Sequence, residues 1–215
     1  MSRKPPFTLL GTFAHSPVRD RLEIIEKGLV SVDQTGSIVD VCRHGQPAYQ
    51  EVLKTALSSQ QLVETDTGTF IFPGMVDLHI HAPQWPQIGQ VLHRPLQEWL
   101  EQYTFPLEAR YSDTNFAKRV YKDLVNTLIA NGTTTGVYFS TIHQLATQVL
   151  AQACLDIGQR AFVGKVVMDD EEQCPDYYRD HSIDAALAGT VESIEFIRES
   201  KNNSAALVQP MVTPR

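Results

Sequence analysis

The strongest constraint on the fold is a regular alternation of helix-like and strand-like segments along the second part of the chain. Apolar residues recur at helical spacing in three segments, 115–131, 143–157 and 182–200. Short apolar segments of strand character lie beside them, at 75–82, 133–140, 160–168 and 205–213. Strands that alternate with helices at this spacing form βα units, so the sequence predicts an α/β fold with four parallel strands.

Two of these segments carry more detailed expectations. In the last helix one face collects apolar side chains, and the pattern assigns that face to the core: Ile183, Leu187, Val191, Ile194 and Ile197. The last strand contains Pro210 and is followed directly by Pro214, and prolines are unfavourable inside a sheet because each removes a ladder donor. This strand also has no lysine, whereas Lys165 lies on the strand before it.

The first 72 residues have a different pattern, with short strands and turns. Strand-like segments at 28–32 and 37–41 flank the turn at 33–36, which predicts a hairpin. A hairpin alone is marginally stable in water, so this region needs further strands. We therefore divide the chain into a small β region, residues 1–72, and an α/β region, residues 73–215. Residues 83–112 are rich in proline and are expected to form a long loop or lid, with one short helix near 96–103.

Charge and composition exclude several classes of protein. The chain has 18 basic and 25 acidic residues, a formal net charge of −7, which argues against nucleic-acid binding. We expect no membrane partner, because no apolar run approaches the ~20 residues that span a bilayer. The basic start is not followed by the apolar core of a secretory signal. The three cysteines form no CxxC motif, which favours free thiols in a reducing cytoplasm.

The segment 75–82 carries the only pattern that points to chemistry. Alternate residues of a strand share a face, so Asp77, His79 and His81 lie on the face opposite Val76, Leu78, Ile80 and Ala82. The two histidines fall at the carboxyl end of a parallel strand, where such sheets build their sites. Neutral imidazoles at this spacing can bind one divalent metal, zinc above all, and Asp77 can orient a ligand. The spacing alone is equally compatible with two histidines that bind nothing.

Residues 72–81 resemble the Pro-Gly-(apolar)-(apolar)-Asp-x-His-x-His signature of the amidohydrolase superfamily. That resemblance implies a metal-dependent (β/α)8 barrel of the TIM-barrel type, with a small β-sandwich built from both chain ends. A series of further segments, in order, is similar to the guanine deaminase family within that superfamily: 79–85, 96–100, 103–108, 131–135, 158–165 and 212–215.

The resemblance implies roles for named residues. His79 and His81 would be zinc ligands, and His81, Gln84 and Arg215 would contact the purine. The implied reaction is zinc-dependent hydrolysis of guanine to xanthine and ammonia, a step of purine catabolism. Because strand four lacks a lysine, the site is expected to hold a single zinc rather than two metals.

The resemblance also implies that part of the site lies elsewhere. In the similar family the catalytic acid is a glutamate after strand five, and the further zinc ligands come from strands five, six and eight, all beyond residue 215. A complete (β/α)8 barrel takes roughly 250 residues, so we expect the first half of a barrel, strands 1–4, preceded by an incomplete β-sandwich. No catalytic acid or base is expected in this chain, which would be inactive alone and a homodimer when full length.

Two other interpretations remain open. The chain can belong to another deaminase or hydrolase of the same superfamily that acts on a different heterocycle. It can also be a non-catalytic half-barrel that is a remnant or binds a partner. The pairing of Gln84 with Arg215 favours guanine, because an amide and a guanidinium together offer donors and acceptors to a lactam ring.

Overall fold

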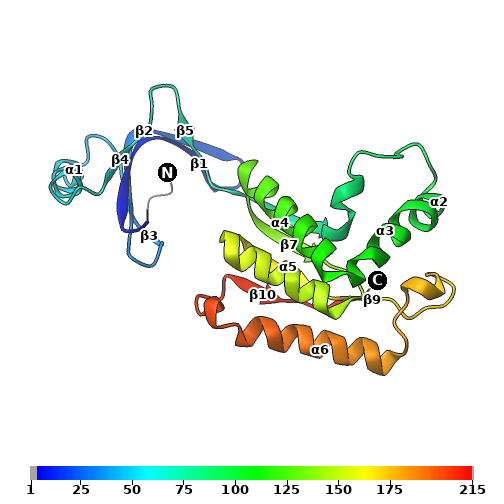
Figure 1. Cartoon of the computed structure of the whole chain (residues 1–215). Helices are drawn as coiled ribbons and strands as arrows, with labels where there is room; N and C mark the ends of the chain where they lie inside the picture. Colours follow the sequence, from blue (N-terminus) through cyan, green and yellow to red (C-terminus); the bar gives the residue numbers. More distant parts are fainter. Residues whose placement is uncertain (1–3, 215) are drawn as a thin grey trace. The chain divides into compact units, whose positions relative to one another are not determined.

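The computed structural model describes residues 4–214, and the chain divides into two compact units, Met1–Pro73 and Gly74–Arg215 (Figure 1). Each unit has its own apolar core. Within residues 4–214, the helices are all too short or too polar to cross a membrane. Arg215, for which a purine contact was expected, lies outside the described residues.

The first unit is a five-stranded sheet with one helix. Its strands are β1 (Phe7–Val18), β2 (Arg21–Val32), β3 (Ile38–Cys42), β4 (Leu62–Glu64) and β5 (Phe70–Ile71), and the helix is α1 (Tyr49–Ser58). The order is β3-β2-β1-β4, with β5 also paired to β1. The predicted hairpin is the antiparallel pair of β2 and β3. The sequence pattern missed β1, because only two of its twelve side chains are buried and no alternation marks it.

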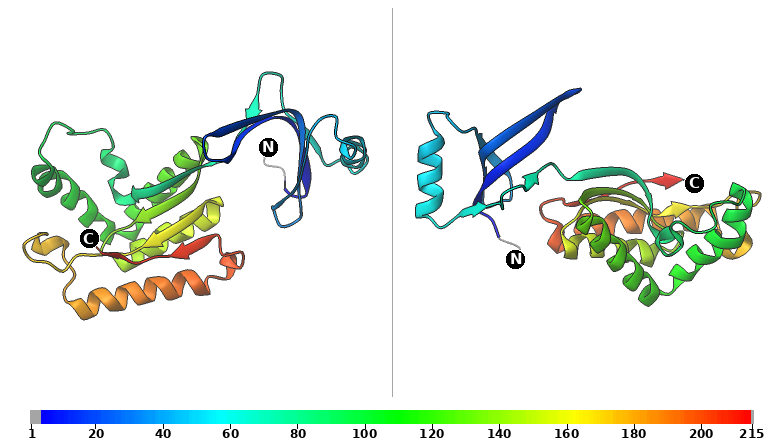
Figure 2. Two further views of the ribbon diagram at one scale, coloured as in Figure 1. Left: turned by 180° about the vertical axis from the view of Figure 1, so that it is seen from behind. Right: turned by 90° about the horizontal axis from the view of Figure 1, so that it is seen from above.

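The second unit is a parallel sheet with helices that alternate along the chain (Figure 2). Its main strands run in the order β6-β7-β8-β10, and all three pairings are parallel. These strands are β6 (Met75–His81), β7 (Thr133–Phe139), β8 (Arg160–Gly164) and β10 (Val208–Pro210). The helices between them are α4 (Thr114–Ala130), α5 (Gln144–Ile157) and α6 (Ile183–Glu199). The predicted α/β fold with four parallel strands is therefore confirmed.

Short gaps divide the last two predicted strands. β9 (Val166–Val167) follows β8, and β11 (Thr213–Pro214) follows β10, and these two short strands pair with each other in parallel. The hydroxyl of the buried Thr213 donates to the carbonyl of Lys165 over 2.6 Å, which fixes this second pair. The prolines of the predicted strand are tolerated because each stands at the last position of a short segment. Pro210 ends β10, which is a terminal strand of the described sheet.

The buried face of α6 differs from the predicted one. Ile183, Leu187 and Val191 are 63%, 57% and 50% exposed, so these members of the predicted apolar face lie largely in solvent. The buried residues are mostly small, namely Ala186, Gly189, Thr190, Ser193 and Ile197. A face of small side chains lets the helix backbone approach its neighbours closely, and that approach outweighs the apolar periodicity.

The predicted apolar face of β6 is covered only at its carboxyl end. Ile80 packs against the main core and Ala82 is fully buried, whereas Val76 and Leu78 are 58% and 71% exposed. β6 is a terminal strand of the described sheet, and the core cluster gathers near its carboxyl end. The best-packed part of this strand is thus the part that carries the histidines.

The proline-rich segment after β6 contains more helix than the sequence predicts. A 3-10 helix, η1 (Ala82–Gln87), follows the strand directly. A nearly continuous helical run then covers α2 (Leu96–Trp99), a π turn η2 (Leu100–Thr104), α3 (Phe105–Ala109) and η3 (Arg110–Ser112). Pro83 stands in the first turn of η1 and Pro95 precedes α2, and at both places a missing N–H costs nothing. The prolines therefore mark helix starts here as well as loops.

Candidate active site

β6 brings two imidazoles together at its carboxyl end. The Nε2 atoms of His79 and His81 lie 3.0 Å apart. Phe139, which is paired with His81 in the neighbouring strand β7, contacts both rings, with centroid distances of 4.5 Å to His79 and 5.1 Å to His81. His79 is exposed and His81 is half-buried. The strand and one aromatic side chain therefore turn both Nε2 atoms toward the same point.

This geometry fits a shared metal ion. Two ligands of a tetrahedral zinc, each at about 2.0–2.1 Å, stand about 3.3 Å apart, close to the separation seen here. Imidazole nitrogen is also a preferred zinc donor. Within residues 4–214, no third histidine, cysteine or carboxylate joins the pair to form a cluster of three. The described residues therefore supply two ligands, whereas a catalytic zinc usually has three from protein.

Asp77 supports the main chain of the histidine segment. Its Oδ1 accepts a hydrogen bond from the backbone N–H of His79 over 3.1 Å. The sequence suggested that this carboxylate orients a ligand, and the recorded bond reaches the ligand's backbone rather than its ring. By holding that N–H, Asp77 constrains the strand at the point where β6 and β7 lose regular register, between Asp77 and Ile80.

A cavity of about 370 Å³ opens beside the histidines. Its lining comes from β6, from η1 with the residues after it, from α2 and from α4. The polar members of the lining are Asp77, His79, His81, Gln84 and Gln87, and the aromatic members are Trp85 and Trp99. Of the residues expected in the site from sequence, His79, His81, Gln84 and Asp77 therefore share one cavity.

Gln84 is held from behind by a residue that the sequence reasoning left without a role. Its Nε2 donates to Oε1 of Glu108 over 2.9 Å, and Glu108 is fully buried. A glutamate in a short helix normally faces solvent, and for that reason the pattern did not single it out. The available signal was its position between the apolar residues Leu107 and Ala109, inside the segment 103–108 that carries the family resemblance.

Two further buried contacts fasten η1 to the segment 104–111. The amide of Gln87 donates to the hydroxyl of Thr104 over 2.8 Å, and the hydroxyl of Tyr111 donates to the carbonyl of Pro83 over 2.9 Å. Thr104 and Tyr111 are fully buried. Burial raises the pKa of the Tyr111 phenol well above its usual range, so it stays a neutral donor. We call η1 together with residues 104–111 the frame.

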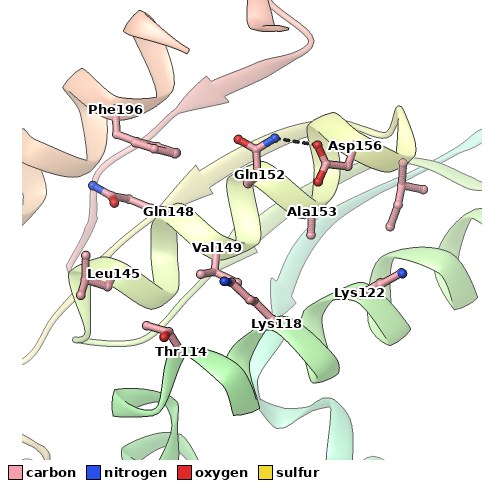
Figure 3. Close-up of a pocket in the computed structure, with 11 residues that line it drawn as sticks. Thr114, Lys118, Lys122, Leu145, Gln148, Val149, Gln152, Ala153, Asp156 and Phe196 are labelled. Carbon is pink, nitrogen blue, oxygen red and sulfur yellow. Dashed lines mark hydrogen bonds between the residues drawn. The ribbon is translucent and has the colours of Figure 1, made fainter. Parts of the chain in front are cut away.

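A larger groove of the second unit lies elsewhere, on the outer faces of the helices (Figure 3). It has a volume of about 760 Å³ and runs over α4 and α5 to Phe196 of α6. Lys118 and Lys122 lie on one wall, and on the other Gln152 donates to Asp156 over 2.6 Å. Its lining contains no histidine or cysteine and a single carboxylate, so it lacks a metal-binding set. The smaller cavity at the histidines is the better candidate for chemistry.

Comparisons with known proteins identify the family. The amidohydrolase family profile matches residues 70–214. Guanine deaminase of Mus musculus is 38% identical over 218 residues, and guanine deaminase of Dictyostelium discoideum is 36% identical over 217 residues. These alignments cover 100% and 95% of this chain but 46% of each relative. The chain thus spans about half the length of the curated relatives it matches.

Solved structures give the same result. The crystal structure of guanine deaminase from C. acetobutylicum, with guanine bound in its active site, superposes with a TM-score of 0.84 at 31% identity. The match covers 98% of this chain and 46% of that one. A triazine hydrolase at 16% identity has a TM-score of 0.74, which shows a shared fold alone.

Proposed function

Because the chain belongs to the amidohydrolase family, we propose that it forms the first part of a zinc-dependent guanine deaminase site. The observation that carries the proposal is the convergence of His79 and His81, with Nε2 atoms 3.0 Å apart, in the cavity that Gln84 also lines. The similarity to guanine deaminases extends over the whole chain, and the α/β fold expected from the sequence is the one they share.

His79 and His81 would hold the zinc through their Nε2 atoms. Bound zinc lowers the pKa of a coordinated water toward neutrality and supplies the hydroxide that hydrolysis of an aminopurine requires. Phe139 and the backbone contact of Asp77 keep the two rings oriented toward one point. At least one more protein ligand and a proton donor for the departing ammonia are needed. Within residues 4–214 no third histidine, cysteine or carboxylate joins the pair as a metal ligand, so we assign the further ligand, and with it the proton donor, to polypeptide outside that range.

Gln84 would bind the purine edge. Its Nε2 is engaged by Glu108, which leaves its carbonyl oxygen to accept a hydrogen bond from a ligand. Guanine presents ring and amino N–H groups that suit such an acceptor. His81 lies three residues before Gln84 and would contact the ring beside the metal. Arg215 would provide a planar donor fork for the ring carbonyl, a role that stays a prediction from the resemblance.

The proposal is tested on the complete gene product that carries these 215 residues, loaded with zinc. We expect guanine to be converted to xanthine with one ammonia released per turnover, and we expect a chelator to abolish the reaction and added zinc to restore it. Adenine and a triazine are supplied in parallel as other heterocycles. Turnover of one of these with none of guanine would contradict the substrate, and turnover that survives complete zinc removal would contradict the metal.

A further inference from the structure

We propose that Glu108 is a positioning residue that holds the Gln84 amide with its oxygen toward the cavity and so selects a ring edge that presents N–H donors. The identity of the ring rests on the proposed function, whereas the contact between the two side chains does not. Glu108 has no place in the reaction as derived above, because it lies behind Gln84 and does not line the cavity.

The direction of the hydrogen bond fixes the amide. A carboxylate accepts hydrogen bonds and donates none, so only the NH₂ group of Gln84 can face it. The donor–acceptor distance is 2.9 Å, and a hydrogen bond to a carboxylate is about twice as strong as one between neutral groups. If the amide flipped, two oxygen atoms would oppose each other. An unsupported glutamine would present its oxygen or its nitrogen to the cavity with similar ease.

The surroundings make this orientation rigid. Glu108 is fully buried, and the two other contacts of the frame, Gln87 to Thr104 and Tyr111 to Pro83, tie the same two segments together. Because three side-chain bonds connect η1 to residues 104–111, Gln84 cannot move far from Glu108. Orienting the amide before the ligand arrives lowers the entropy that binding must lose.

The cost of burying Glu108 also points to a role in selection. A carboxylate gives up strong hydration when it is buried, and an apolar side chain of similar volume often gives equal or better stability. Apolar packing is available to the same helix, since Phe105 and Ala109 of the frame belong to an apolar cluster. We therefore attribute the buried Glu108 carboxylate to its effect on the Gln84 amide that it orients.

The first test reads the Gln84 amide directly, without any purine. The complete gene product is labelled with side-chain ¹⁵N glutamine, and the Gln84 resonances are assigned by their loss in Gln84→Leu. We expect one downfield, slowly exchanging NH₂ proton, and we expect Glu108→Gln to move it upfield and to speed its exchange at least tenfold. Glu98→Gln, on the neighbouring exposed helix, is the matched control and should change neither property. Gln84 resonances that are unaltered in Glu108→Gln would overturn the inference.

The second test reads selectivity. With Glu108→Gln we expect the KM for guanine to rise up to about 10-fold, the value of one hydrogen bond, while kcat stays within about threefold. The ratio of the adenine inhibition constant to the guanine KM should narrow by a similar factor. A fall in kcat alone, with KM and this ratio unchanged, would contradict a positioning role.

An exchanged pair keeps the test valid if Glu108→Gln folds poorly. In the double variant Gln84→Glu/Glu108→Gln the donor and acceptor trade places, and a carboxylate oxygen still faces the cavity. We expect this double variant to regain the melting temperature of the unsubstituted protein and its preference for guanine over adenine. A variant that folds but keeps the reduced preference would refute the inference. If the amide responds to Glu108 but guanine is not deaminated, the proposed function fails and the positioning role stands.

Discussion

The two sides of the cavity differ in how firmly the protein holds them. On the metal side, His79 and Asp77 are exposed, and the histidine rings are oriented mainly by the strand and by Phe139. On the amide side, Glu108, Thr104 and Tyr111 are fully buried and hydrogen-bonded to η1. The difference follows from what each side binds. A metal ion itself draws its ligands into place, whereas recognition of a ring edge needs donors and acceptors that are fixed in advance.

The largest expected effect on activity comes from replacing a histidine on the metal side. In the complete gene product, His79→Ala or His81→Ala should lower kcat/KM for guanine at least about 1000-fold, because a catalytic metal contributes several kcal/mol and each 1.36 kcal/mol is tenfold. The melting temperature of the metal-free protein should change little, since these side chains add little to the core. His181→Ala, at an exposed histidine before α6, is the control. Full activity in one of the single variants would show that the histidine replaced in it is not part of the site.

Removing a buried hydrogen bond on the amide side should mainly lower the free energy of unfolding. Tyr111→Phe keeps the ring that packs on Tyr121 and Phe116, but it leaves the carbonyl of Pro83 without its buried donor. We expect a loss of about 1–3 kcal/mol in the free energy of unfolding, measured by urea denaturation. Tyr177→Phe removes a hydroxyl from a tyrosine that is 57% exposed and should cost almost nothing. Equal effects of the two substitutions would show that the frame is not held as described.

A smaller, pH-dependent effect comes from His143, which also touches the frame. Burial is the main cause that lowers the pKa of His143, and a hydrogen bond to the backbone of Ala109 opposes it. Lys165 disfavours the charged imidazole and Asp180 favours it. The unfolded chain therefore binds a proton near pH 6.5, where the folded chain does not, so the free energy of unfolding falls as the pH drops below about 6.5.

The variant His143→Gln isolates that contribution. The free energy of unfolding, measured by denaturation, should fall less between pH 7.5 and pH 5.5 in the variant than in the parent chain. The two falls should differ by less than about 1 kcal/mol. His44→Gln, at an exposed histidine of the first unit, is the control. A parent chain that gains stability on acidification through this window, with the gain lost in His143→Gln, would reverse the sign assigned here.

The parts of the fold that were predictable are those with strong periodicity. Helices at 114–130 and 144–157 follow apolar spacing and end at residues beside Gly132 and Gly158, both with positive φ, so their bounds were predicted to within a residue or two. The strand β1 was not predictable, because partial burial along its whole length leaves no alternation. The buried face of α6 was predicted wrongly, since small residues that allow close approach carry no hydrophobic signal.

The candidate site divides in the same way. The spacing of His79 and His81 on a strand predicted their shared face, and the structure places their Nε2 atoms together. Glu108 was not predictable from pattern, because its role depends on a contact 24 residues away in sequence. Local periodicity reports which face a side chain shares, but it carries no information about a partner on a separate helix. The frame could be found only once η1 and α3 had been placed beside each other.

The central claim is that His79 and His81 bind one zinc through Nε2, and zinc X-ray absorption of the 215-residue chain tests it most directly. We predict one zinc per chain, with two imidazole nitrogens at about 2.0–2.1 Å and water completing the coordination. The variant His79→Ala/His81→Ala should lose both imidazoles from the spectrum and the bound zinc from the protein. One zinc per chain that still shows two imidazole nitrogens in this double variant would contradict the account.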